Sequence, residues 1–598
     1  MRKAKTILDV ISERGKRGLP LERVYRLLFN SDLYLLAYGR IYRNTGAMTS
    51  GVTMETADGM SMKKIESIIE KVRFERYRWT PVRRVYIEKK YSSQKRPLGI
   101  PSWSDKLLQE VIRLILEAYY EPQFSSHSHG FRPNLGCHTA LTEISNNWTS
   151  TSWFIEGDIS KCFDDINHDI LLSILSENIH DNRFLRLISQ LLTAGYLEDW
   201  KYNKTLSGSP QGAIVSPILA NIYLNQLDNF VEKTLLPDYN RGKARNSNPE
   251  YERLRSLMRY RVSKGRKDEA TLIRKQMRNI PSRDTNDPNY RRLRYVRYAD
   301  DFLLGFCGPR EEAEEIKIRL SEFLQQRLEL QLSDTKTLIT HARTQVAQFL
   351  GYEIVTQKSD HKRDENGRRT INGRIGLKVP IHVIRTKCQN YMRHGKAVHR
   401  TERIHHSAFS TISQYQQEYK GIVEYYRLAY NLHRFNRLKW IMEQSLTKTL
   451  AHKFRITVSK VYDRFGVTVR TPDGPRKILK VEVHREKGRH PLVARWGCIS
   501  LKRQRNITLN DQPTAVWNFR TELLERLLAD TCELCGSQEK IEVHHIRHLK
   551  DLRKRGQAER PEWIKTMAAR NRKTLIVCQK CHNDIHAGRI RQKPRSEI

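Results

Sequence analysis

Three aspartates at the ends of apolar segments are the first candidates for chemistry in this sequence. Asp300 and Asp301 are adjacent between the aromatic-rich runs 294–298 and 302–305, which predicts a β-hairpin with both carboxylates at its tight turn. Asp158 follows another apolar, strand-like run. Adjacent carboxylates repel each other, and Mg²⁺ held by carboxylates and substrate phosphates relieves that repulsion. Three carboxylates from separate strands could clamp two metal ions for in-line phosphoryl displacement, whereas an isolated Asp-Asp pair is more often an ordinary acidic turn.

The C-terminal region holds a second candidate site. Its cysteines form two C-x-x-C pairs, Cys532/Cys535 and Cys578/Cys581. Two such pairs can close a tetrahedral Cys₄ site with no open position, which predicts a structural Zn²⁺; four unrelated reduced cysteines are the alternative. The other five of the nine cysteines are scattered singly, so we expect a reducing compartment rather than a disulfide framework.

The whole chain is strongly basic. Its 598 residues suffice for several domains, and 107 Lys and Arg against 66 acidic residues give a net charge of +41. This charge predicts a polyanionic partner bound with salt-sensitive affinity; a merely soluble basic protein is the alternative. No apolar run approaches the roughly 18 residues that cross a bilayer. The N-terminus lacks the apolar core of a secretory signal, so we expect neither membrane association nor secretion.

Local patterns predict the elements that position these groups. Ser61 is expected to cap a helix that follows a loop at 46–59. A long basic insertion at 235–290, with helical stretches, precedes the acidic hairpin and is expected to contact RNA or DNA. Helical periodicity returns over 381–469, and residues 470–520 are basic and strand-like, which suits DNA binding.

Several motifs resemble those of reverse transcriptases. Asp158, Pro-Gln-Gly at 210–212 and Tyr-Ala-Asp-Asp at 298–301 are similar to the palm motifs of these enzymes. Their order and surroundings resemble group II intron-encoded proteins. The blocks that carry this closer resemblance are Arg-Pro-Leu-Gly-Ile-Pro at 96–101, His-Gly-Phe-Arg-Pro at 129–133, Ser-Pro-Ile-Leu-Ala-Asn-Ile-Tyr-Leu at 216–224 and Phe-Leu-Gly-Tyr at 349–352.

The resemblance implies a multidomain α+β fold. A right-hand polymerase with fingers and palm would be followed by a helical thumb/maturase domain and a small zinc-stabilised ββα-metal HNH domain. The expected units are the N-terminal extension and fingers at 1–152, the palm at 153–360 with its basic insertion at 235–290, the thumb/maturase domain at 361–470, a DNA-binding region at 471–525 and the HNH endonuclease at 526–598.

The resemblance also assigns roles around the three aspartates, which would bind Mg²⁺ and carry polymerase catalysis. The residues implied to contact the incoming dNTP are Lys89, Arg96, Phe163, Gln211 and Lys336. Phe163 would exclude a ribose 2′-hydroxyl, and Lys336 would protonate departing pyrophosphate. Glu88 replaces the proline usual in the family, and Lys90 is a second candidate beside Lys89, so the lysine that reaches the phosphate stays open.

The histidines near the cysteine pairs resemble those of HNH nucleases. The residues implied to hold one catalytic divalent ion are His544, His582 and His586. His545 would be the general base, since a neutral imidazole suits proton removal near neutral pH. Lys573 stands where the HNH pattern places Asn, and Asn571 lies two residues earlier, so the Asn role stays open. A zinc-stabilised DNA-binding module without cleavage is the alternative.

The resemblance covers essentially the whole chain and implies an RNA-directed DNA polymerase, a maturase that assists intron splicing and an HNH DNA endonuclease in one protein. The expected partners are group II intron RNA, target duplex DNA and dNTPs. The expected cofactors are Mg²⁺ at both enzyme sites and Zn²⁺ at the cysteines. The expected location is the cytoplasm or nucleoid of a bacterium, with an organelle as the alternative. A splicing-only maturase with inactive enzyme sites is the rival function, and a stand-alone reverse transcriptase is a second rival.

Overall fold

The computed structural model spans residues 1–598. It describes all of them except 1–2, 45, 89–94, 199–200, 204–207, 209–211, 285–286, 334, 360, 366–369, 472–473, 485–489, 507–521, 549–551, 553–560, 571 and 590–598. Five residues considered above lie outside the described residues: Lys89, Lys90, Pro210, Gln211 and Asn571.

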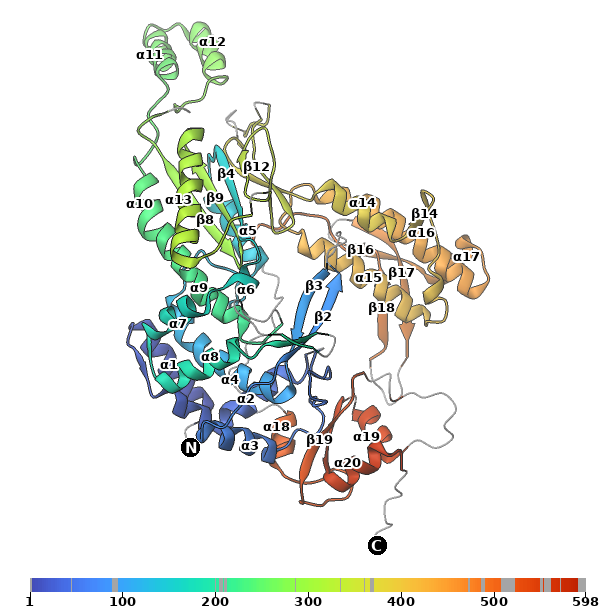
Figure 1. The fold of residues 1–598 in the computed structure, drawn as a ribbon. Coiled ribbons are helices and arrows are strands. Elements are labelled where there is room, and N and C mark those ends of the chain that lie inside the picture. The colour runs from blue at the N-terminus through green and yellow to red at the C-terminus, as the bar shows by residue number, and fades with distance from the viewer. Residues whose placement is uncertain are drawn as a thin grey trace.

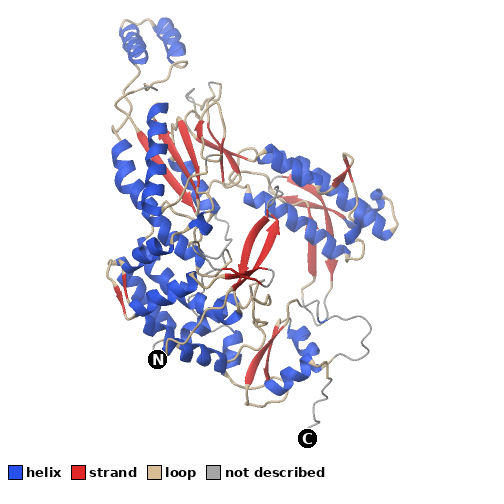
Figure 2. Ribbon diagram, viewed as in Figure 1, coloured by secondary structure: helices blue, strands red, loops and turns tan. Residues whose placement is uncertain are grey.

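Helices dominate the N-terminal part of the chain (Figures 1 and 2). The helix α4 (Trp103–Tyr120) is buried on nearly every side because α1 and α2 pack against it. Ser61 caps α3 as predicted, since its Oγ accepts a hydrogen bond from Lys64 N at 3.3 Å. The other elements of this layer are α1 (Ala4–Lys16), β1 (Leu21–Glu22), η1 (Val24–Phe29), α2 (Ser31–Ile41), α3 (Met62–Arg73) and η2 (Glu121–Gln123).

An antiparallel sheet with strand order β10-β4-β9-β8 carries the acidic hairpin. Alternate side chains of a strand point to opposite faces, so this sheet contributes to two cores. Phe154 and Leu303 share one core with α5, whereas Ile155 and Leu304 share the other with α9 and α13. The elements are α5 (Cys137–Asn147), β4 (Trp153–Asp158), α9 (Ser216–Phe230), β8 (Arg292–Tyr298), β9 (Asp301–Cys307), α13 (Arg310–Leu328) and β10 (Ile339–His341).

A second sheet, with strand order β3-β2-β6-β7, lies between the N-terminal helices and the helical unit coloured yellow and orange (Figure 1). Its strands are β2 (Val82–Glu88), β3 (Lys95–Ile100), β6 (Tyr196–Glu198) and β7 (Lys201–Asn203). The short elements between β4 and β6 are α6 (Cys162–Asp165), α7 (His168–Ser176), β5 (Ile179–His180) and α8 (Asn182–Leu192).

The basic insertion forms a helical arm that projects away from the sheet (Figure 1). The helical stretches predicted in the insertion include two helices, α11 and α12, that turn back on each other near Gly265. Gly265 has φ +71°, a left-handed conformation that glycine adopts without steric cost. The elements of the insertion are the π-helical turn η3 (Val231–Leu235), α10 (Leu236–Tyr239), α11 (Pro249–Ser263) and α12 (Lys267–Met277).

The next unit combines helices with three small sheets, β11-β12-β13, β14-β15 and β16-β17-β18. Tyr415, Tyr419 and Tyr426 are at most 5% exposed, so their rings pack helices together. The strand-like region begins at Gly466 rather than at residue 470. The elements are β11 (Ala347–Phe349), β12 (Tyr352–Thr356), β13 (Ile375–Lys378), α14 (Ile381–Gln389), β14 (Met392–Arg393), β15 (Lys396–Ala397), η4 (Thr401–Arg403), α15 (Ala408–Tyr425), η5 (Leu432–Arg434), α16 (Phe435–Phe454), α17 (Val458–Phe465), β16 (Gly466–Thr471), β17 (Gly474–Val483) and β18 (Leu492–Trp496).

The C-terminal unit packs against the N-terminal helices (Figure 1), and Val543 and Ile585 belong to the same hydrophobic core as α2, α3 and α4. Across the described residues, no helix combines the length and apolar character required to traverse a bilayer. The elements of this unit are α18 (Glu522–Leu528), β19 (Ile541–His545), α19 (Glu562–Arg570), β20 (Thr574–Cys578) and α20 (Gln579–His586).

Candidate active and metal sites

The three aspartates lie where β4 pairs with β9. Asp158 is opposite Asp301 in the antiparallel register, and Asp300 belongs to the tight turn that joins β8 to β9. Lys336 Nζ donates a hydrogen bond to Asp158 Oδ2 at 2.8 Å. The structure therefore brings four of the sequence-predicted residues from three separate segments to one end of the sheet.

Burial and crowding disfavour negative charge in this cluster. Desolvation, followed by the nearby Asp158 and Asp300, raises the pKa of Asp301 to about 7. Desolvation also raises the pKa of Asp300, and the positive charges of Arg96 and Lys336 oppose that rise. A cation would remove the repulsion, and these oxygens suit Mg²⁺. Among the described residues, the three carboxylates do not form a group whose ligand atoms all lie within 4.8 Å of one another.

A buried ion pair supports the turn. The Arg297 guanidinium is fully buried and donates to Asp228 through Nη2 at 2.6 Å and through Nε at 2.8 Å. Its Nη1 also donates to the carbonyl oxygen of Ala299 at 2.9 Å. Ala299 has φ +55°, and a Cβ on Gly130 would lie 2.3 Å from Ala299 N. The turn is thus fixed on one side by the ion pair with Asp228 of α9. On the other side the backbone of Gly130 packs so closely that a larger residue would not fit.

Two of the residues predicted to contact the dNTP flank this cluster. Phe163 lies in α6, directly after β4, and its half-buried ring meets Phe131 edge-to-face at a centroid distance of 6.3 Å. Arg96 is exposed on β3, and its charge acts on Asp300. The structure gives no position for Lys89 or Gln211, which lie outside the described residues.

The four paired cysteines gather at one point of the C-terminal unit. Cys532 and Cys535 precede β19, whereas Cys578 ends β20 and Cys581 lies in α20. Their sulfur atoms all lie within 4.8 Å of one another, and the sulfurs of Cys535 and Cys578 are 3.6 Å apart. Four thiols gathered this closely fit a soft tetrahedral metal ion.

A second cluster joins three histidines to a carboxylate that the sequence motifs did not include. His544 on β19 and His582 and His586 on α20 surround Asp58, which belongs to the loop before α3. The Asp58 Oδ2 is 2.8 Å from His586 Nε2, and its Oδ1 is 3.2 Å from His582 Nε2. Glu542 Oε2 lies 2.7 Å from His582 Nδ1, which directs the other ring nitrogen toward the cluster.

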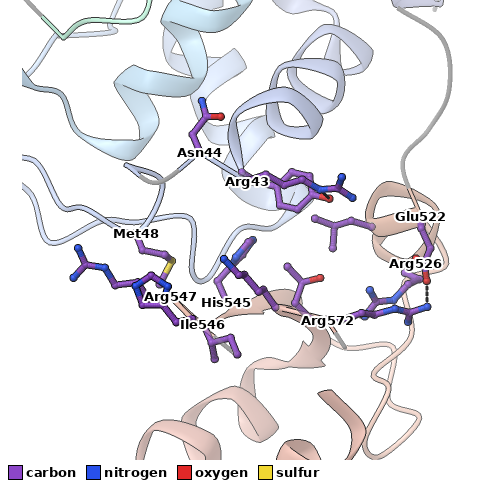
Figure 3. A pocket seen from close by; sticks show the side chains of 14 residues that line it. Arg43, Asn44, Met48, Glu522, Arg526, His545, Ile546, Arg547 and Arg572 are labelled. Carbon is purple, nitrogen blue, oxygen red and sulfur yellow. Dashed lines mark hydrogen bonds and ion pairs between the residues drawn. The ribbon is translucent and has the colours of Figure 1, made fainter. Parts of the chain in front are cut away.

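His545 faces away from this cluster, toward the N-terminal helices. Its Nε2 is 3.3 Å from the Tyr38 hydroxyl, and burial lowers its pKa to about 4. The ring borders a pocket of about 670 Å³ with a basic lining (Figure 3). The basic residues that line this pocket with His545 are Arg43, Arg526, Arg547, His548, Arg572 and Lys573.

Comparisons with known proteins cover most of the chain. Residues 87–354 match the reverse transcriptase (RNA-dependent DNA polymerase) family, residues 372–490 the type II intron maturase family, and residues 532–582 the AI2M/AI1M-like HNH endonuclease family. The chain is 37% identical to the group II intron-encoded protein LtrA of Lactococcus lactis subsp. cremoris, over 98% of this chain and 99% of that protein.

The chain belongs to the group II intron-encoded proteins. It is also 36% identical to an uncharacterized 91 kDa protein in the cob intron of Schizosaccharomyces pombe, over 98% of this chain and 72% of that protein. It is therefore a multifunctional intron-encoded protein with reverse transcriptase, maturase and HNH endonuclease domains.

The structure adds residues that the motifs of this intron-encoded protein did not reveal. The sequence pattern only weakly indicates the Arg297–Asp228 ion pair. Arg297 lies in an apolar strand and Asp228 in an apolar helix, and a charge buried in such an element requires a partner. Glu542 stands in the histidine motif, but its type alone suggests a solvent-facing position. Asp58 had no signal beyond its place in a predicted loop.

Proposed function

We propose that this protein copies intron RNA into DNA at Asp158, Asp300 and Asp301, and that its HNH site nicks the DNA strand whose new 3′-hydroxyl primes the synthesis. The observation that carries the proposal is the pairing of Asp158 with Asp301 beside the turn that holds Asp300. The net charge of +41 supports binding of intron RNA and target duplex DNA.

The proposed domains follow the family resemblance. The β10-β4-β9-β8 sheet is the palm, the β2–β3 hairpin and the N-terminal helices are the fingers, and α14–α17 are the thumb and maturase surface that grips intron RNA. The proposed bounds are 1–152 for the extension and fingers, 153–360 for the palm, 235–290 for its nucleic-acid-contacting insertion, 361–470 for the thumb and maturase, 471–525 for DNA binding and 526–598 for the endonuclease.

In the proposed polymerase reaction, Asp158, Asp300 and Asp301 would hold Mg²⁺, which would supply activation of the primer 3′-hydroxyl and charge stabilisation for the leaving pyrophosphate. Lys336, now hydrogen-bonded to Asp158, donates a proton to that pyrophosphate. Arg96 supplies positive charge beside the triphosphate, and by resemblance Lys89 and Gln211 complete the dNTP contacts. The support for this arrangement is that Arg96 and Lys336 both act electrostatically on Asp300.

Phe163→Val is expected to weaken selection against ribonucleotides. The shorter side chain would leave room for a 2′-hydroxyl, so the ratio of dNTP to rNTP incorporation should fall by about tenfold or more, as expected when about 1.4 kcal/mol of discrimination is lost. Single-nucleotide extension with matched dNTP and rNTP measures this ratio. Phe131→Val is the control, because Phe131 contacts the Phe163 ring without belonging to the proposed pocket. An unchanged ratio in Phe163→Val would remove the proposed role.

In the proposed nuclease reaction, His545 removes a proton from the attacking water. A divalent ion held by His544, His582 and His586 would stabilise charge on the phosphodiester. The Tyr38 hydroxyl, 3.3 Å from His545 Nε2, orients the ring. The basic lining of the adjacent pocket supports the approach of DNA, and Zn²⁺ held by the four cysteines is the proposed structural ion.

Cys581→Ser is expected to destabilise the C-terminal unit while the polymerase stays active. A structural zinc site contributes about 10 kcal/mol of binding energy to folding, and loss of one thiolate should remove several kcal/mol of it. Limited proteolysis should then cleave the C-terminal unit first, with cDNA synthesis retained. Cys498→Ser is the control because Cys498 is exposed and lies outside the cysteine cluster. Equal protease resistance of both variants would exclude a structural metal at these cysteines.

The proposed polymerase is tested by primer extension on poly(rA)/oligo(dT) with Mg²⁺, using protein freed of nucleic acid. Labelled DNA product is expected. Failure of clean, folded protein to extend the primer would favour the splicing-only maturase. Sequencing the RNA that co-purifies with the protein identifies the intron partner, and recovery of only unrelated RNA would contradict the maturase assignment.

A further inference from the structure

The loop before α3 extends the sheet of the C-terminal unit. Gly59 N donates to the carbonyl oxygen of Val543 at 3.0 Å, and Val543 N donates to the carbonyl oxygen of Met60 at 2.9 Å. Met60 is fully buried. This short backbone pairing with β19 places the residue just before it, Asp58, over the histidine cluster (Figure 1 shows the two units side by side).

The Asp58 carboxylate contacts all three histidines of the proposed ion site. Its Oδ2 lies 2.8 Å from His586 Nε2, and its Oδ1 lies 3.2 Å from His582 Nε2 and 3.5 Å from His544 Nδ1. The Oδ1 also accepts a hydrogen bond from His545 N at 2.6 Å. One ligand atom from Asp58 and one from each of the three histidines all lie within 4.8 Å of one another.

The ring nitrogens of this cluster are crowded together, and those of His544 are poorly satisfied by protein atoms. His544 is 4% exposed, its Nδ1 has the long 3.5 Å contact with Asp58, and its Nε2 makes no hydrogen bond with the described part of the chain. The Nε2 atoms of His582 and His586 lie 3.1 Å from each other. Buried polar groups without partners are costly, and three converging imidazoles are costly unless a cation lies between them.

We propose that Asp58 is the fourth ligand of this ion, which then ties the N-terminal helical layer to the HNH domain. The inference rests on the proposed three-histidine site. Three imidazole nitrogens and one carboxylate oxygen complete a tetrahedral set with no open position. His544 and His582 are buried in this docked arrangement whereas His586 is exposed, so it is Asp58, rather than burial of the whole site, that occupies the position a phosphodiester would take on the ion. The docked arrangement is a resting state in which a carboxylate holds the place of the DNA phosphate.

The test is visible absorption of Co²⁺ added to the full-length protein with Zn²⁺ retained at the cysteines. Four-coordinate Co²⁺ absorbs far more strongly than the six-coordinate ion expected at the polymerase aspartates. The wild type should therefore show an intense band, and Asp58→Asn, in which water can replace the carboxylate, should shift and weaken this band and bind Co²⁺ about tenfold or more weakly. Asp58→Cys should restore the band and add a sulfur-to-cobalt charge-transfer band, which a purely structural role of Asp58 would not produce.

The controls separate this inference from the proposed nuclease site. Glu55→Gln removes an acidic group from the same loop, where Glu55 pairs with Lys64 and Ser104 instead, and should keep the wild-type spectrum. His586→Ala should lose the band; if it does not, the three-histidine site itself is wrong. The role of Asp58 alone would be overturned by two results, provided that His586→Ala loses the band. One is a wild-type spectrum in Asp58→Asn, and the other is the absence of a charge-transfer band in Asp58→Cys.

Amide hydrogen exchange gives an independent measure of the same coupling. Gly59 N and Val543 N form the backbone pairing between the two units, so Co²⁺ should slow their exchange in the wild type and in Glu55→Gln. Co²⁺ should have little effect on the exchange of these two amides in Asp58→Asn, even if they exchange faster in this variant before Co²⁺ is added. Equal slowing in the wild type and Asp58→Asn would contradict the proposed ligand.

Discussion

Asp300→Asn is expected to abolish cDNA synthesis while leaving splicing assistance intact. The substitution keeps the size of the side chain but removes a charged oxygen from the turn between β8 and β9. Loss of several kcal/mol of transition-state stabilisation by a metal ligand corresponds to a rate decrease of about a thousandfold or more. Primer extension measures the polymerase, and self-splicing of the intron RNA at low Mg²⁺ measures the maturase.

Asp165→Asn is the matched control for this prediction. Asp165 is exposed in α6, close in sequence to Asp158, and it takes no part in the proposed ion site. Its variant should extend the primer at the wild-type rate. Loss of both activities in Asp300→Asn would point to misfolding, which circular dichroism and a thermal melt would detect, and full polymerase activity would refute the assignment of the carboxylate cluster.

The position of each aspartate of the candidate polymerase cluster on its own element could be predicted, because that information is local. Asp300 and Asp301 stand at a hairpin turn between two apolar strands, and Asp158 ends a strand. The strand patterns therefore predict that each carboxylate lies at the end of its strand. The register that sets Asp158 opposite Asp301 depends on long-range pairing of β4 with β9, which the pattern of either strand does not encode. The family resemblance, rather than the strand patterns, joined these segments in advance.

The contribution of Asp58 could not be predicted from motifs. Asp58 and His586 are separated by 528 positions, and an acidic residue in a Gly-containing loop is ordinarily solvent-facing. Its position depends on two backbone hydrogen bonds, from Gly59 N to the carbonyl oxygen of Val543 and from Val543 N to the carbonyl oxygen of Met60, which most residue types could make. The Arg297–Asp228 pair behind the hairpin is similar, because each charge is unexpected on its element and only the fold shows that they meet.

The same docking explains why the nuclease residues are so deeply placed. His545, the proposed general base, is 5% exposed and faces Tyr38, yet a group in that role must reach a water molecule beside the phosphodiester. The pocket beside it, lined by Arg43 from one unit and Arg547 from the other, offers a basic approach (Figure 3).

His545→Ala is expected to stop second-strand nicking while reverse splicing into DNA and primer extension continue. Loss of a general base typically lowers the rate by about 10²- to 10⁴-fold. Nicking of a labelled duplex target by the ribonucleoprotein measures the loss, and the reverse-splicing product on the other strand is the internal standard. His548→Ala is the matched control, since His548 lies in the same pocket but is exposed and has no proposed role in proton transfer. Nicking at the wild-type rate in His545→Ala would show that another group removes the proton. Loss of both nicking and reverse splicing would show that the substitution disturbs DNA binding rather than the nuclease chemistry.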